Sequence, residues 1–182
     1  MEPYTGDILA MASAPTFDVT KLDLTDPALD FSVFRNRAVT DLYEPGSTFK
    51  IVTASAALEE GVFHLNQMID TSPGVIYFGS RPISDVRNYG RLSFADVVVE
   101  SSNVGTSKIG LALGPERLGR YVRRFGFGQT ISRDFPGESR GIVHDPSRLN
   151  DSDLASVSMG YNISVTPLQM VAAMSAVANG GE

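Results

Sequence analysis

The sequence predicts one globular domain in which helices predominate and a few short strands are set among them. The chain has 182 residues, of which 42% are hydrophobic, and this length is enough to bury a sizeable core. A strand is expected at residues 7–13, where small and apolar residues follow a Thr-Gly turn signal. A small hairpin is expected within residues 71–90, where Val-Ile-Tyr-Phe and a later Ile flank a Gly-Ser turn. Residues 14–40 indicate a loop with a short helix, and residues 129–152 indicate a loop.

Five segments carry helical signals: residues 47–60, 93–100, 104–113, 115–125 and 167–178. The first follows a Pro-Gly break, ends at Gly61 and is apolar nearly all round, so it should be buried on most sides. Ser93 can cap the second helix. The fourth has apolar residues at positions i, i+3, i+4 and i+7. The last opens with Thr166-Pro-Leu-Gln169, which combines a cap, a first-turn proline and a capping-box glutamine.

The composition excludes several functional classes. A net charge of −6 and an isoelectric point near 4.9 argue against a nucleic-acid-binding protein, which presents a basic face. The absence of cysteine rules out disulfides, thiolate nucleophiles and cysteine–zinc sites. The two histidines, His64 and His144, lie in no metal-binding pattern and are expected at the surface. We therefore expect neither a metal nor a cofactor.

The sequence contains no signal for membrane insertion or secretion. Its longest apolar run, near Ala54, is far shorter than the roughly 20 residues that a membrane-spanning helix needs. Strand-like sequence begins almost at once, with no secretory leader before it. Residues 179–182 read as a helix stop signal with nothing after it. These features suggest a piece of a longer protein, whose anchor would lie outside it.

A Ser-x-x-Lys spacing at residues 47–50 is the first pattern that could carry chemistry. A Pro-Gly turn delivers Ser47 to a helix start, where N–H groups without intrahelical acceptors could stabilise an oxyanion. Lys50 lies one turn on, on the same face. Because burial and the positive helix end both disfavour the ammonium, a neutral Lys50 could take the serine proton. Taken alone, the same pattern also fits a helix cap followed by an ordinary lysine.

A second pattern, Ser101-Ser102-Asn103, lies in the break between two predicted helices. One interpretation is a polar turn in which Ser102 or Asn103 caps the following helix. The functional interpretation places the Ser101 hydroxyl between Lys50 and the leaving nitrogen of a substrate, as a proton relay. Asn103 would then hydrogen-bond the substrate amide. The two patterns together arise by chance far less often than either one.

Several ordered motifs resemble those of the class B penicillin-binding proteins, over nearly the whole chain. They are Thr5-Gly-Asp-Ile-Leu-Ala-Met-Ala-Ser13, Tyr43-Glu-Pro-Gly-Ser-Thr-Phe-Lys50, Ser101-Ser-Asn-Val-Gly105, Phe125-Gly-Phe-Gly128, Thr166-Pro-Leu-Gln169 and Ala178-Asn-Gly-Gly181. The resemblance implies an α+β fold of the penicillin-binding and serine β-lactamase-like type, in which helices flank an antiparallel sheet. This stretch would supply a helix-rich lobe and one or two amino-terminal strands.

The resemblance also implies a function. The family forms an acyl-serine with a D-Ala-D-Ala stem peptide and passes the acyl group to an amine of a neighbouring peptide, which cross-links peptidoglycan. β-Lactam antibiotics acylate the same serine. By position, Ser47 would be the nucleophile and Lys50 the base, and Ser101 and Asn103 would form the second motif and bind substrate. Glu44 favours the cell-division (septal) type.

Family membership further implies partners and a location. The full-length protein would act with cell-division and glycosyltransferase proteins. It would face the periplasm and be anchored to the inner membrane by an amino-terminal segment.

The family's third motif, Lys-Thr-Gly or a close variant on a strand beside the site, does not occur in the sequence. The only lysines are Lys21, Lys50 and Lys108, and Lys108-Ile-Gly110 is expected on a helix and lacks the hydroxyl residue. We therefore expect residues 1–182 to be a partial transpeptidase domain, with its third motif and carboxy-terminal strands beyond Glu182. Such a fragment would be inactive or impaired by itself. Its opening strand would have an unpaired edge.

Two other functions stay open. A serine β-lactamase shares the serine–lysine start but needs a group that activates water for deacylation. Glu138 is the one loop candidate, and a turn carboxylate is a simpler interpretation of it. A β-lactam-sensing or division-scaffold module would keep both motifs and use the site only for binding. An unrelated serine hydrolase is disfavoured because the G-x-S-x-G motif is absent.

Overall fold

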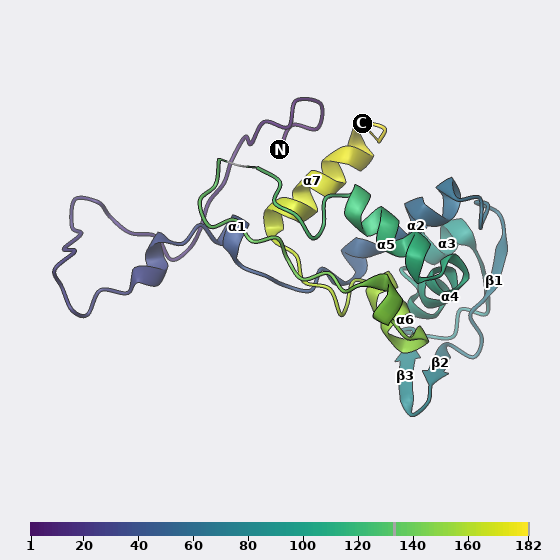
Figure 1. The fold of residues 1–182 in the computed structure, drawn as a ribbon. Coiled ribbons are helices and arrows are strands. Elements are labelled where there is room, and N and C mark those ends of the chain that lie inside the picture. The colour runs from purple at the N-terminus through teal and green to yellow at the C-terminus, as the bar shows by residue number, and fades with distance from the viewer. Residues whose placement is uncertain (133, 182) are drawn as a thin grey trace.

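A computed structural model describes residues 1–132 and 134–181 and shows a helical body from which a long arm projects (Figure 1). The α-helices are α1 (Arg37–Thr40), α2 (Lys50–Glu59), α3 (Phe94–Val99), α4 (Asn103–Leu113), α5 (Pro115–Arg124), α6 (Asp151–Ser158) and α7 (Pro167–Ala178). The 3-10 turns are η1 (Phe31–Phe34), η2 (Gly46–Phe49) and η3 (Pro146–Arg148). The strands are β1 (Met68–Asp70), β2 (Val75–Phe78), β3 (Arg81–Ser84) and β4 (Arg91–Ser93).

The body is built round α4, which packs against α6, α2, α5 and α3. Small residues permit this close packing. A Cβ on Gly110 would collide with the Ser158 side chain of α6, and one on Gly105 would come within 2.7 Å of Val97 on α3. The continuous core contains the buried aromatic residues Phe49, Phe63, Phe94, Tyr121 and Phe127. Burial of this apolar surface is what holds the helices together.

The four short strands form two separate antiparallel pairs rather than one sheet. β1 pairs with β4, and β2 pairs with β3 as the hairpin expected within residues 71–90. Ile83 on β3 is buried and packs against Ala155 and Met159 in a small second core. The hairpin is thereby attached to the α6 side of the body, next to the amino end of α4 (Figure 1).

The strand expected at residues 7–13 is not formed. These residues belong to no strand, and most of them are exposed. The preceding residues close a turn, in which the Gly6 N–H donates to the carbonyl oxygen of Glu2 at 3.0 Å. Apolar alternation makes a strand only where a neighbouring strand supplies hydrogen-bond partners, and none of the described residues pairs with this segment. The expected unpaired strand edge is therefore absent from the structure.

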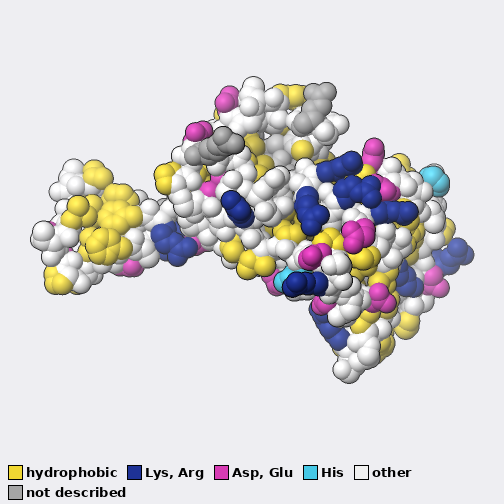
Figure 2. Space-filling view, viewed as in Figure 1, with side chains coloured by type: hydrophobic (Ala, Val, Ile, Leu, Met, Phe, Trp, Pro, Cys, Tyr) yellow, Lys and Arg dark blue, Asp and Glu magenta, His cyan; other side chains and the backbone are white. Residues whose placement is uncertain are grey.

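Residues 14–36 form the arm, which runs out from the body and back (Figure 1). Hydrophobic side chains gather on it, as the yellow surface at the left of Figure 2 shows, and three of them are aromatic. Phe34 contacts Phe17 with ring centroids 4.8 Å apart and Phe31 at 6.0 Å. All three rings remain partly exposed, at 39% for Phe17, 65% for Phe31 and 38% for Phe34. The arm agrees with the loop and short helix expected over residues 14–40.

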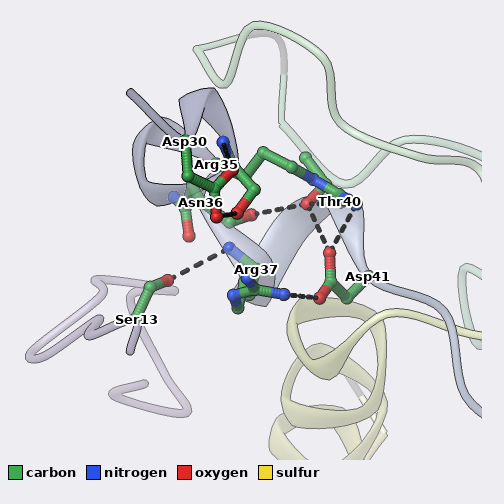
Figure 3. A network of polar contacts seen from close by, with 8 residues as sticks. Ser13, Asp30, Arg35, Asn36, Arg37, Thr40 and Asp41 are labelled. Carbon is green, nitrogen blue, oxygen red and sulfur yellow. Dashed lines mark hydrogen bonds and ion pairs between the residues drawn. The ribbon is translucent and has the colours of Figure 1, made fainter. Parts of the chain in front are cut away.

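A polar network fixes the base of the arm (Figure 3). Arg35 and Arg37 both reach the Asp41 carboxylate, at 2.6 and 2.9 Å. The backbone N–H of Arg37 also donates to Ser13 Oγ at 3.0 Å. This hydrogen bond joins the outgoing and returning segments of the arm where they leave the body. Thr40 Oγ1 donates to the same carboxylate at 2.9 Å, and this hydrogen bond is the largest cause of the lowered pKa of Asp41.

The helical predictions are largely confirmed. α3, α4, α5 and α7 lie within a residue or two of the expected ranges, and Thr166 and Gln169 make the complete capping box on α7. The α-helix expected to begin at Ser47 begins instead at Lys50, because the preceding turn takes the tighter 3-10 form that is common at helix starts. α6 was not expected. Among the described residues, no helix is both long and apolar enough to cross a membrane.

Candidate active site

Ser47 lies on a tight turn that leads into α2. Gly46 precedes it with a φ of +56°, a left-handed conformation that glycine adopts readily. The Gly46 N–H donates to the carbonyl oxygen of Gly160 at 2.9 Å, and Thr48 Oγ1 donates to the carbonyl oxygen of Pro45 at 2.7 Å. The backbone of the turn is thus fixed on both sides, while the Ser47 side chain stays exposed.

Lys50, the first residue of α2, is buried although it carries an amine. Only 4% of it is exposed. Its Nζ donates to the Ser101 carbonyl oxygen at 2.5 Å, to Ser101 Oγ at 3.0 Å and to Asn103 Oδ1 at 2.8 Å. An ammonium group has three donors, so these three acceptors match it fully. The lysine is therefore held against the second motif.

The environment favours loss of the lysine proton. Burial lowers the pKa of Lys50 from 10.5 to about 8, and the nearby charge of Asp85 opposes part of this effect. At pH 7 about one amine in ten is then neutral, against fewer than about one in a thousand for a solvated lysine. The expectation that burial would make Lys50 a usable base agrees with this environment.

The turn at residues 101–103 brings two predicted side chains to the lysine. Ser101 has a φ of +52°, an uncommon conformation for a residue with a Cβ and one that recurs at functional sites. Ser102 caps α4, because its Oγ accepts from the Gly105 N–H at 2.8 Å. The structural interpretation of the turn is therefore confirmed for Ser102, while the functional roles of Ser101 and Asn103 stay predictions. Ser102 starts the helix, while Ser101 and Asn103 face Lys50.

Asp85, which follows β3 directly, was missed by reasoning from the sequence. Its Oδ2 accepts from Ser102 Oγ at 2.8 Å, and its Oδ1 accepts from the N–H groups of Asn103 at 2.5 Å and Val104 at 3.1 Å. The Asn103 amide also donates to the carbonyl oxygen of Ser84 at 2.9 Å. An aspartate that caps a helix from about seventeen positions away leaves no local pattern in the sequence, because capping signals are read within a few residues.

The loop at residues 160–162 was also missed, and it packs against the turn that carries Ser47. A Cβ on Gly160 would collide with the Gly46 carbonyl oxygen and lie 2.6 Å from Phe49 Cβ. The Asn162 N–H donates to Glu44 Oε1 at 2.8 Å. Glu44, which the sequence suggested as a mark of the septal type, thus links the segment before Ser47 to the loop at residues 160–162.

The structure brings Lys50, Ser101 and Asn103 together by direct hydrogen bonds. Ser47 lies one turn before Lys50, but in the described structure no hydrogen bond joins its hydroxyl to either Lys50 or Ser101. Ser47 and Lys50 are therefore neighbours along one short turn, as expected, but in the described structure their side chains make no direct hydrogen bond.

The other sequence candidates lie outside this cluster. The Glu138 carboxylate accepts from the N–H groups of Ile131 at 2.6 Å and Ser132 at 3.0 Å, so it closes its own loop. Lys108 lies on α4, as expected, and donates to the carbonyl oxygen of Asp70. His64 and His144 are exposed. Within residues 1–132 and 134–181, no cluster of acidic or histidine side chains could hold a metal ion.

Comparison with known proteins identifies the family to which the chain is similar. Residues 1–182 match the family described as the penicillin-binding protein transpeptidase domain. The chain is 40% identical to stage V sporulation protein D of Bacillus subtilis, and the match covers all of this chain and 28% of that protein. It is 37% identical to the peptidoglycan D,D-transpeptidase FtsI of Escherichia coli, over 91% of this chain and 27% of FtsI. The chain therefore spans less than a third of the length of these relatives.

Solved structures give the same result. A structure titled as the transpeptidase domain of penicillin-binding protein 3 from Burkholderia pseudomallei superposes with a TM-score of 0.76 at 33% identity, over 79% of this chain and 44% of that one. A second, titled as a peptidoglycan glycosyltransferase from Burkholderia ambifaria, gives 0.77 at 32% identity, over 82% of this chain and 48% of the other. The expected fold class is confirmed. With its whole length matched and its Ser-x-x-Lys and Ser-x-Asn elements in order, the chain belongs to the penicillin-binding protein transpeptidase domain family.

Proposed function

We propose that this chain is part of a peptidoglycan D,D-transpeptidase that works through an acyl-serine and is acylated by β-lactams. The observation that carries the proposal is the buried Lys50, which is held by three hydrogen bonds to Ser101 and Asn103 beside an exposed Ser47. Burial of a lysine side chain costs free energy of folding, so a buried lysine points to a functional role. Relatives with "peptidoglycan D,D-transpeptidase" in their names support the substrate class.

In the first half-reaction, Ser47 Oγ attacks the carbonyl carbon of the D-Ala-D-Ala peptide bond. Lys50 accepts the proton of the serine hydroxyl. The C–N bond breaks, and a proton passes through the Ser101 hydroxyl to the leaving nitrogen of the terminal D-Ala. In the second half-reaction, an amine of a neighbouring stem peptide attacks the ester, the bond from the acyl carbon to Ser47 Oγ breaks, and the proton that the amine loses restores the Ser47 hydroxyl. A β-lactam opens on Ser47 by the first half-reaction and stops at the ester.

The contacts of Lys50 explain why Ser101 suits the relay. When the amine is neutral it has two donors and one lone pair, and the lone pair must stay available for the Ser47 proton. The Ser101 carbonyl oxygen and the Asn103 amide oxygen, which contact Nζ, can only accept a hydrogen bond. The Ser101 hydroxyl can accept from Lys50 and also donate to a leaving nitrogen. Of these three contacts, the Ser101 hydroxyl is therefore the one that can pass a proton on.

The proposal extends to the whole polypeptide. Residues 1–182 would be a partial domain, completed by later strands that carry a Lys-Thr-Gly motif, with catalysis impaired without them. The protein would act on the periplasmic side, anchored by a segment amino-terminal to these residues. There it would work beside cell-division and glycosyltransferase proteins on peptidoglycan stem peptides. The septal type is proposed from Glu44.

Penicillin labelling of the whole polypeptide tests the proposal. Wild-type protein should form a stable covalent adduct, and Ser47→Ala should form none. Ser55→Ala, on the helix α2 that follows the Ser47 turn, is the matched control and should label normally. Equal labelling of wild type and Ser47→Ala would rule out Ser47 as the nucleophile. Rapid nitrocefin turnover would instead indicate a β-lactamase, and clean acylation without peptide transfer would indicate a sensor.

A further inference from the structure

A cavity of about 440 Å³ lies between the end of α5 and the segment at residues 140–145. We propose that it binds the phosphate group of a small organic phosphate ester. None of the four candidate active-site residues lines this cavity, so the inference does not depend on the function proposed for them.

The first observation is the charge of the cavity lining. Arg123 and Arg140 both line the cavity, as does His144. Both arginine side chains are exposed, and no described residue makes an ion pair with either guanidinium group. The protein as a whole carries a net charge of −6. Two unpaired guanidinium groups at one cavity therefore make it a local site of attraction for anions.

One carboxylate, that of Asp145, also lines the cavity. Its Oδ1 accepts from the N–H of Ser147 at 3.0 Å and from Ser147 Oγ at 2.9 Å. The pKa of Asp145 is lowered first by these hydrogen bonds and, to a smaller extent, by the charges of Arg148 and Arg123. Arg123 is thus near Asp145 without forming an ion pair with it. The lining residues carry two guanidinium charges against one carboxylate.

The second observation is the rigid backbone round the cavity. The side chain of Gln169 is fully buried, and its Nε2 donates to the carbonyl oxygens of Gln129 and Arg140 at 2.9 Å each. Both of these residues line the cavity. Ile142, from the same segment as Arg140, pairs with Ser164 through two backbone hydrogen bonds of 2.7 and 3.0 Å. A cavity whose walls are fixed in advance loses little conformational entropy when a ligand binds.

Two guanidinium groups favour phosphate over carboxylate as the ligand. One guanidinium can donate in parallel to both oxygens of a carboxylate, so a carboxylate needs only one arginine. A phosphate group has three terminal oxygens and nearly two negative charges at neutral pH, which suits a pair of arginines.

The size of the cavity favours an ester over the free ion. Its volume lies in the range of small-molecule sites and exceeds what a phosphate ion fills. Phe127 and Val143 add apolar lining to the charged groups. The space beside the phosphate would therefore hold the organic part of the ligand.

Substitutions of the two arginines test the site. Arg123→Ala and Arg140→Ala should each weaken phosphate binding about tenfold or more, the size of effect that loss of charge-assisted hydrogen bonds produces. Arg124→Ala is the matched control. Arg124 is the next residue of α5, is also exposed, and lies over the Tyr121 ring instead of lining this cavity. It should bind phosphate as the wild type does.

Asp145→Asn gives a test in the opposite direction. The amide oxygen can still accept the hydrogen bonds from Ser147, so the turn is kept while the negative charge is removed. We expect this variant to bind phosphate several-fold more tightly than the wild type. A residue with a purely structural role would not strengthen binding when it is replaced.

The experiment is calorimetric titration of the whole polypeptide with glycerol 3-phosphate, inorganic phosphate and acetate. The ionic strength is held constant, because salt screens exposed charges. The wild type should bind glycerol 3-phosphate most tightly, then inorganic phosphate, and acetate most weakly. Melting temperatures in the absence of phosphate establish that each variant is folded.

Several results would overturn the proposal. They are no saturable binding of either phosphate by the wild type, unchanged binding in both Arg123→Ala and Arg140→Ala, and a loss in Arg124→Ala as large as that in Arg123→Ala. The last would mean diffuse attraction to the surface. Acetate bound as tightly as the phosphates would make this a carboxylate site, and inorganic phosphate bound as tightly as the ester would exclude an ester as the ligand. Binding by Asp145→Asn no tighter than by the wild type would remove the argument from local charge.

Discussion

Lys50 shows how a single residue trades stability for chemistry. Its pKa lies near 10.5 in the unfolded chain and at about 8 in the folded one. Between these values the unfolded state binds more protons, so folding stability falls as the pH drops from about 10.5 to 8. Below the folded pKa the loss is complete and constant. The folded protein therefore holds, at neutral pH, an amine that is readily deprotonated.

The acylation rate should follow the titration of this lysine. We expect the rate of acylation by a β-lactam to rise about tenfold per pH unit below pH 8 and to level off above it, because only the neutral amine accepts the serine proton. Stopped-flow acylation between pH 5.5 and 9.5 measures this profile. A rate independent of pH from 6 to 9 would contradict the role of Lys50 as the base.

Residue-level reasoning found the groups that have short, local signatures. Ser47 and Lys50 share one helical turn, and Ser101 and Asn103 share one short break, so their short patterns, together with the ordered family motifs around them, pointed to them. Asp85 acts on the Ser101 turn across the hairpin, and its partners lie seventeen to nineteen positions away. Such contacts depend on tertiary packing. A single sequence does not specify which loop carboxylate will meet which helix start.

At the scale of elements, the nucleophile turn depends on the loop that contacts it. Gly160 has a φ of +83° and lies so close to the turn that a Cβ would collide with the Gly46 carbonyl oxygen. Gly46 donates back to Gly160, so two glycine backbones touch where side chains would separate them. This contact places η2 against the segment between α6 and α7.

Gly160→Ala should therefore destabilise the protein and slow acylation. The left-handed conformation alone costs about 1 kcal/mol, and the forced shift of packed backbone adds about 1–3 kcal/mol. The matched control is Gly61→Ala, which has a similar φ of +64° with no atom within 4 Å of the added Cβ. It should show the conformational cost only. Urea unfolding and β-lactam acylation of both variants measure the difference, and equal losses would refute the packing argument.

Most elements could be predicted because their signals are local. The cap, first-turn proline and glutamine of α7 lie within four residues, and the predicted range agrees with the observed one. α6 escaped prediction because its helical stretch is short and mixes serine and aspartate with apolar residues. Its start signal, Asn150, was present and does accept from the Asp153 N–H. The strand prediction for residues 7–13 was wrong for the opposite reason, because strand formation requires a partner elsewhere in the chain.

At the scale of the whole molecule, the body and the arm are stabilised differently. One core cluster runs through α2, α3, α4, α5, α6 and α7. The arm is held at its base by Asp41 with Arg35 and Arg37 and carries partly exposed aromatic rings (Figures 2 and 3). Its aspartates serve local turns, as when Asp23 accepts from Thr25. The candidate active-site residues from Ser47 to Asn103 all belong to the body.

The same substitution in the two parts should therefore have very different effects. Phe127 is 1% exposed and packs on Phe49, the residue just before Lys50, with ring centroids 5.2 Å apart. Phe127→Ala should cost about 3–5 kcal/mol in unfolding free energy, because it leaves a cavity behind α2. Acylation should slow as well, since Phe49 loses its support. Phe31→Ala removes a ring that is 65% exposed and should cost less than about 1 kcal/mol, with acylation unchanged.

Urea unfolding and β-lactam acylation, measured on both variants in the whole polypeptide, decide this comparison. A loss of stability at Phe31 as large as that at Phe127 would mean that the arm is part of the folding core. The division of the molecule into a body that performs chemistry and a projecting arm would then be wrong. Equal stability losses with acylation slowed only by Phe127→Ala would keep the link between the core and the nucleophile turn. That link requires Phe49 to transmit the change, and Phe49 is fully buried between the Gly160 loop and Phe127.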